Sequence, residues 1–184
     1  MTSRLRRIFG HIVDDLPVDF PGTLTGDERV LSVADLADGT HVVATTFGLW
    51  LPEGTEVRRV GWHLISKATW ANATLVVTEA DELDTVDGAV LLADRLPRTL
   101  RLQRPGRVPE IVHARVTGSI RSRHHRELPG GGAWVVQRSV PGQDGIVLQV
   151  RADPGTDLAA VRSLAVHVAA QVARQIDQVR HPGQ

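Results

Sequence analysis

The chain has 184 residues, of which 42% are hydrophobic and 23% charged, and its formal net charge is zero. These are ordinary values for a folded protein, so the composition argues against disorder and predicts one domain with a single core. Because there is no cysteine, disulfides, thiolate metal sites and cysteine nucleophiles are excluded. No apolar stretch is long enough for a secretory signal or a transmembrane segment, and we expect a cytoplasmic protein.

The charges are distributed unevenly along the chain. Residues 14–94 contain fifteen acids and four bases, whereas residues 95–126 contain nine arginines and a single acid, Glu110. Such an asymmetry can mark a surface that binds anions. The simpler interpretation is that the acidic and basic segments become neighbours in a sheet and neutralise each other.

Residues 1–26 have the pattern of an N-terminal arm. Four apolar residues recur there at helical spacing: Leu5, Ile8, Ile12 and Leu16. This spacing predicts a short amphipathic helix that ends before Pro17, because proline lacks the N–H and clashes with the preceding turn. The arginines of such a helix could touch an anionic membrane, but packing on its own domain is the preferred interpretation.

From Arg29 onward the pattern is that of short β-strands. The predicted strands are residues 30–33, 40–46, 47–51, 57–65, 74–78, 89–93 and 99–103. Turns are predicted at residues 37–39 and 52–54, and an acidic loop at residues 79–87. Seven short strands at this spacing predict a meandering antiparallel sheet, a sandwich or a barrel.

The second half of the chain contains the clearest helix. Residues 109–128 fit either a strand or a helix, and we favour a short helix that continues into a strand. Two more strands are predicted at residues 134–139 and 146–151. From Asp157 to about Arg180, apolar residues recur at three- and four-residue steps, which predicts an amphipathic helix of about six turns lying on the sheet. Val168 and Val172, near the middle of its apolar stripe, are expected to be well buried.

Two stretches carry a resemblance to a known family. Residues 42–50 (VVATTFGLW) and 58–65 (RRVGWHLI), in a meander that ends in one long helix, resemble bacterial pleckstrin-homology-like (PH-like) domains and actinobacterial proteins of this size. The resemblance implies a PH-like antiparallel barrel or curved sheet of about seven or more strands over residues 27–180, capped by the C-terminal helix. Other folds with a long closing helix are a helix-grip ligand-binding domain and a two-layer sheet with a helix.

The first predicted hairpin departs from the family members that bind phosphoinositides. Those domains carry lysine and arginine at this hairpin, whereas here the loop contains Asp35 and Asp38 and no base. Because like charges repel, we expect no phosphoinositide binding at the first hairpin.

Candidate binding residues occur in the arginine-rich segment and among the tryptophans. The candidate anion or partner surface consists of Arg115, Arg121, Arg123, His124 and Arg126. A metal site at His124 and His125 is disfavoured, because adjacent strand residues point to opposite faces. A nucleic-acid site is weakened because residues 95–126 contain no aromatic residue that could stack on a base. Trp50 and Trp70, near strand ends, are candidate interface aromatics, although tryptophans in strands are more often core.

No hydrolase, phosphate-loop or zinc-protease motif is present, and no catalytic, cofactor-binding or metal-binding residue is predicted. The sequence therefore favours a non-catalytic module that binds an unidentified protein partner. The alternatives are a binder of a small molecule or lipid, with a cavity between helix and sheet, and weak binding of a polyanion such as RNA through residues 95–126.

Overall fold

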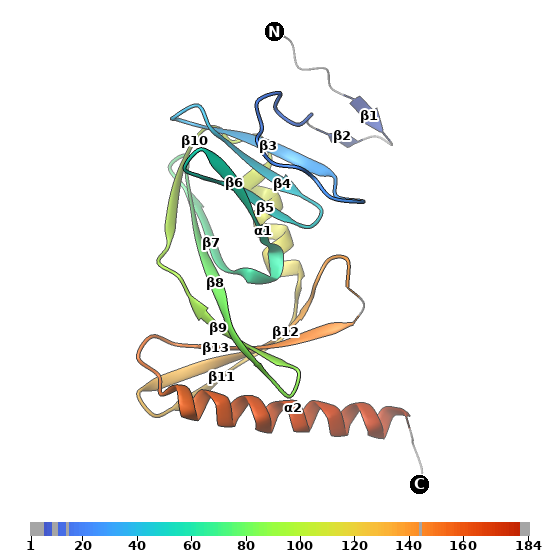
Figure 1. The fold of residues 1–184 in the computed structure, drawn as a ribbon, viewed down its shortest axis with the longest axis vertical. Helices are drawn as coiled ribbons and strands as arrows, with labels where there is room; N and C mark the ends of the chain where they lie inside the picture. The colour runs from blue at the N-terminus through green and yellow to red at the C-terminus, as the bar shows by residue number, and fades with distance from the viewer. Residues whose placement is uncertain (1–5, 9–10, 14, 144, 181–184) are drawn as a thin grey trace. The chain divides into compact units, whose positions relative to one another are not determined.

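The computed structural model describes residues 6–8, 11–13, 15–143 and 145–180 of the chain (Figure 1). Within these ranges it is an α+β fold in which eleven mostly antiparallel strands form a continuous sheet, accompanied by two α-helices. The α+β class predicted from the sequence is confirmed. Neither of the described α-helices is long and apolar enough to cross a membrane.

The chain divides into two compact units. Unit 1 comprises Met1–Glu79 and Leu96–Ser119, and unit 2 comprises Ala80–Arg95 and Ile120–Gln184. Each unit has its own cluster of buried apolar side chains. Sequence patterns predict a single domain over residues 27–180, so the second core is a feature that those patterns did not reveal.

Unit 1 is a seven-stranded antiparallel sheet with one helix. Its elements are β3 (Val30–Leu36), β4 (His41–Thr45), β5 (Gly48–Glu53), β6 (Glu56–Gly61), the 3-10 helix η1 (Trp62–Leu64), β7 (Ile65–Ala71), the first half of β8 (Thr74–Val86), β10 (Arg98–Arg104) and α1 (Val108–Gly118). The strand order is β6-β5-β4-β3-β10-β8, and β7 pairs with the other edge of β8. Val108, Val112 and Val116 are buried at four-residue spacing, which places one face of α1 in the core of this unit.

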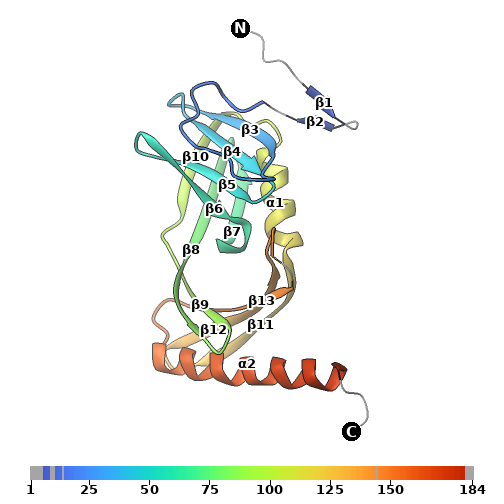
Figure 2. The same cartoon turned by 45° about the vertical axis from the view of Figure 1, so that its right-hand side comes forward.

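Unit 2 is a smaller sheet with the long C-terminal helix. Its elements are the second half of β8, β9 (Ala89–Asp94), β11 (Ile120–Leu128), β12 (Gly131–Ser139), β13 (Ile146–Ala152) and α2 (Leu158–Arg180). The pairing of β13 with β9 is parallel, and the other pairs are antiparallel. Figure 2 shows α2 lying across this sheet, and its residues Val161, Ala165 and Ala169 are buried in the second core.

Two predictions about the last helix are wrong: that it caps a closed barrel, and that Val168 and Val172 are well buried. The sheet is not closed into a barrel, since the path of paired strands begins at β11 and ends at β6. Strands β11 to β13 continue the path beyond β9 and so do not return to β6. In α2 the most buried residues are Val161, Ala165 and Ala169, whereas Val168 and Val172 are only partly buried.

Two local predictions were wrong and one is confirmed. Residues Arg6–Ile8 and His11–Val13 form a small antiparallel pair of strands, β1 and β2, where a helix is predicted, and β-branched Ile8, Ile12 and Val13 favour this outcome. Leu5 lies outside the described residues.

The acidic stretch at residues 79–87 is mostly strand, because β8 continues to Val86 and pairs with β9. The helix that runs into a strand at residues 109–128 is confirmed as α1 followed by β11.

Candidate functional site

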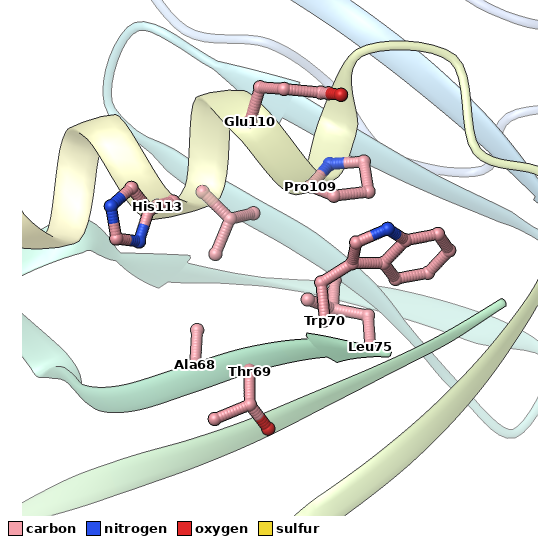
Figure 3. A pocket seen from close by; sticks show the side chains of 8 residues that line it. Ala68, Thr69, Trp70, Leu75, Pro109, Glu110 and His113 are labelled. Carbon is pink, nitrogen blue, oxygen red and sulfur yellow. The ribbon is translucent and has the colours of Figure 1, made fainter. Parts of the chain in front are cut away.

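An apolar groove lies in unit 1 between β7 and α1. It has a volume of about 520 Å³ and is lined by Ala68, Thr69, Trp70, Leu75, Pro109, Glu110, Val112 and His113 (Figure 3). We call it the β7–α1 groove. Its apolar lining and its volume are those of a site that can hold a large side chain or a small ligand.

The groove follows from the position of β7 in the sheet. β7 pairs with β8 on one side only, and among the described residues no strand pairs with its other edge. Buried Leu75 and Val112 lie at its base, and Ala68 is too small to fill the space above them. The N–H and C=O groups along a free strand edge are available to a second extended chain.

Trp70 is the aromatic side chain of this groove. It lies opposite Leu75 at the end of β7, is 41% exposed, and its ring is close to Pro109 in Figure 3. The indole N–H makes no hydrogen bond to a described residue. Glu110 and His113 are exposed on the α1 side, and neither forms an ion pair within the described residues. An exposed indole beside an apolar floor with one carboxylate at the rim is an arrangement suited to binding.

Trp50, the other candidate interface aromatic, belongs to a polar network in unit 1. Its Nε1–H donates to Glu28 Oε1 over 2.9 Å, and its ring meets that of Phe20 edge-on at 5.6 Å. The guanidinium of Arg59 lies 5.8 Å from the centre of the Trp50 ring and 2.5 Å from Glu28 Oε2. Trp50 is therefore half-buried and fully engaged, which is the behaviour of a structural residue.

Glu28 is the centre of this network. Its side chain is 0% exposed, and it also accepts hydrogen bonds from Thr45 Oγ1 and from the backbone N–H of Thr25. Burial alone raises the pKa of this carboxyl, but the hydrogen bonds from Thr45, Trp50 and Thr25 and the charge of Arg59 outweigh it, so the pKa is lowered. Sequence reasoning missed Glu28, because one acid among fifteen carries no signal of its own.

The arginine-rich segment is divided between the two units. Arg115 lies on α1 in unit 1, whereas Arg121, Arg123, His124 and Arg126 are exposed on β11 in unit 2. The expected neutralisation by the acidic half is limited: Arg95 pairs with Asp81, and Arg104 pairs with Asp35. Arg121, Arg123 and Arg126 have no carboxylate partner among the described residues.

At the first hairpin the acidic side chains are held by neighbours. Asp35 contacts His41 Nδ1 at 2.9 Å and Arg104 Nε at 2.7 Å. Asp38 accepts hydrogen bonds from the hydroxyl and the backbone N–H of Thr40, and these lower its pKa. Two acidic side chains thus stand at the place where a phosphate-binding hairpin needs cations, and the hydrogen bonds from Thr40 favour the ionised form of Asp38.

Neither a metal-binding cluster nor a relative emerges. Among the described residues there is no group of three or more histidines, aspartates and glutamates that could hold a metal ion. The chain was compared with protein-family models, curated proteins and solved structures, and none of the three comparisons gives a match.

Proposed function

We propose that this protein is a non-catalytic interaction module that binds an extended segment of a partner protein in the β7–α1 groove. The observation that carries the proposal is the free edge of β7 beside an apolar groove with an exposed tryptophan. Strand addition at a sheet edge gives affinity through main-chain hydrogen bonds, while a neighbouring pocket gives specificity through one side chain.

The strand order of unit 1 supports a PH-like origin for this module. Seven antiparallel strands follow one another almost as a meander, and a helix, α1, comes directly after the last of them. The sequence resemblance assigns the closing role to the long C-terminal helix. We now propose that α1 has that role, because α1 packs on the core of unit 1 whereas α2 packs on that of unit 2.

The lining of the groove indicates the chemistry of the partner segment. Ala68, Leu75 and Val112 suit a large apolar side chain, and Trp70 can cover one face of it. Glu110 is the charged residue of the lining, so a lysine or arginine next to the apolar residue complements it. The partner is thus an extended segment with an apolar anchor and an adjacent base.

Selection of random peptides displayed on phage against the full chain tests this function. We expect enriched peptides that share an apolar position beside a basic one, and whose affinity falls by tenfold or more in Trp70→Ala. Glu110→Lys should shift the selected peptides from basic to acidic, whereas the matched control Glu56→Lys, an exposed acid on β6, should leave the selection unchanged.

Two results would overturn the proposal. One is the absence of any enriched peptide from a library that yields binders for a known peptide-binding domain. The other is equal affinity of the selected peptides for the wild type and for Trp70→Ala. Selective binding of a small apolar molecule, lost in Trp70→Ala while peptides fail, would assign the groove to a small ligand instead.

A further inference from the structure

The exposed arginines of β11 have no ion-pair partner among the described residues, whereas His125 on the same strand pairs with Asp153 and Glu127. Arg121, Arg123 and Arg126 lie on a strand at the end of the sheet order, and none of them forms an ion pair within the described residues. In the same unit Arg95, Arg151 and Arg162 do have carboxylate partners. The charge on β11 is therefore available to an external anion.

The fold also supplies the aromatic residue that this basic segment lacks in sequence. In the β11–β12 hairpin, Trp134 lies directly opposite His125. The guanidinium carbon of Arg123 is 5.6 Å from the centre of the Trp134 ring, and the His125 and Trp134 rings are 5.0 Å apart. The aromatic rings of His125 and Trp134 and the guanidinium of Arg123 thus form one patch on the sheet.

This patch is held in place by its surroundings. The Nε2 atom of His125 lies 2.7 Å from Asp153 Oδ2, which fixes the imidazole ring. Gly132 gives that ring its space, since a Cβ at this position would come within 2.5 Å of the imidazole. Arg151, opposite Trp134 on β13, is itself paired with Asp94, and the Glu127 carboxylate lies 3.7 Å from His125 Nδ1.

Aromatic rings that can stack, next to guanidiniums without a carboxylate partner, match one class of ligand. Guanidiniums neutralise phosphates, and aromatic or guanidinium planes stack on bases. The bases of a duplex are already stacked on each other, so a side chain on a sheet face reaches them only in a single strand. Lipid headgroups and sulfated sugars offer the anion without the π-face.

We infer that the face of the β11–β12 hairpin that carries Trp134 binds single-stranded nucleic acid, with Arg121 and Arg123 on the phosphates and one base stacked at the patch of Arg123, His125 and Trp134. This site is independent of the β7–α1 groove of unit 1. Its sequence preference is weak, because stacking and phosphate contacts accept any base.

Fluorescence anisotropy with a labelled twelve-nucleotide RNA and the full chain tests this inference. Two neutralised phosphates give a slope of log K against log salt of about −1.4 for a single strand. The double variant Arg121→Ser, Arg123→Ser should abolish most of the binding. The matched control is Arg101→Ser, Arg107→Ser, which removes two exposed arginines of unit 1 that have no ion pair in the described chain, and it should bind as the wild type does.

The stacking part of the site is tested separately. Trp134→Leu should weaken binding by about fivefold or more, while Trp134→Phe keeps a ring and should retain most of it. DNA of the same sequence should bind like RNA, and a duplex should bind more weakly. The Trp134 variants are interpreted only if their circular dichroism and melting match the wild type, and the arginine variants remain as a test if they do not.

Three outcomes would overturn the inference. The first is equal loss of RNA affinity in the two double variants, which would reduce the effect to net charge. The second is equal binding of duplex and single strand with no effect of Trp134→Leu in a folded protein. The third is binding of heparin or of phosphatidylserine vesicles without binding of RNA at the same salt concentration.

Discussion

Replacement of the buried Glu28 by alanine is expected to destabilise unit 1 by about 3 kcal/mol. The change removes the acceptor of Thr45, Trp50, Arg59 and the N–H of Thr25. Removing one partner of a buried ion pair costs about 3–5 kcal/mol. The low end applies, because the Arg59 side chain is 34% exposed and regains water when its partner is lost. Such a loss is a large part of the stability of a small domain, which is about 5–15 kcal/mol.

Tryptophan fluorescence during urea unfolding measures this change, since Trp50, Trp62 and Trp70 all belong to unit 1. A loss of 3 kcal/mol lowers the urea midpoint by about 1 M or more. The pH dependence adds a second measurement. Because the pKa of Glu28 is lowered in the folded state, its stabilisation is present above the unfolded pKa of about 4.3 and is lost as the pH falls through the lower folded pKa. Glu28→Gln should remove that part of the pH dependence.

The control is Asp27→Ala, an exposed neighbour with no ion pair among the described residues, which should unfold like the wild type. A Glu28→Ala protein within about 0.5 kcal/mol of the wild type, the usual range of surface substitutions, would refute the reasoning. It would show that the network contributes no more than the water that replaces it.

Two further predictions concern α2 and the first hairpin. A chain that stops before Thr156, or the variant Val161→Asp, should be aggregated or lack cooperative unfolding, because the apolar stripe of α2 completes the second core. Gln171→Ala on the exposed face of α2 should melt like the wild type. A soluble truncated chain with an unchanged melt would contradict this. Inositol trisphosphate should give no saturable heat in calorimetry, because the first hairpin presents Asp35 and Asp38 where a phosphate needs cations, and like charges repel. A saturable titration that disappears when these two residues are changed to serine would show the opposite.

Elements with a strong local pattern could be predicted from the sequence. The apolar stripe of α2 fixes a helix whatever it packs on, and Pro109 followed by valines at four-residue spacing fixes α1. In the same way, β-branched residues and the Asp38-Gly39 turn locate the β3–β4 hairpin. These signals lie within a few residues of the structure that they determine.

The pairing of distant segments could not be predicted in this way. Nothing in the alternation of residues 146–152 shows that β13 pairs in parallel with β9, more than fifty residues earlier. The second core follows from that pairing, and so does the failure of the sheet to close. Because the acids at 79–87 suggest a solvated loop, the continuation of β8 was missed as well.

The same contrast between local sequence signals and long-range pairing applies to the candidate sites. The exposure of the β11 arginines follows from their charge, and Trp70 was named as a candidate although its groove partners Pro109, Glu110 and His113 were not. Trp134 was missed as a neighbour of Arg123 because only the hairpin register brings them together.

The interleaving of the two units along the chain has a consequence for synthesis on the ribosome. Unit 1 is complete once Ser119 has emerged, whereas the β8–β9 hairpin of unit 2, made earlier, must wait for β13 before the far edge of β9 is paired. At about 5–20 residues per second this interval lasts roughly 3–10 s. During that time the nascent chain exposes an apolar strand, Ala89–Asp94, with one unpaired edge, of the kind that chaperones recognise. Slow translation of residues 96–145 should therefore lower the yield of folded protein, even though it gives unit 1 more time to fold.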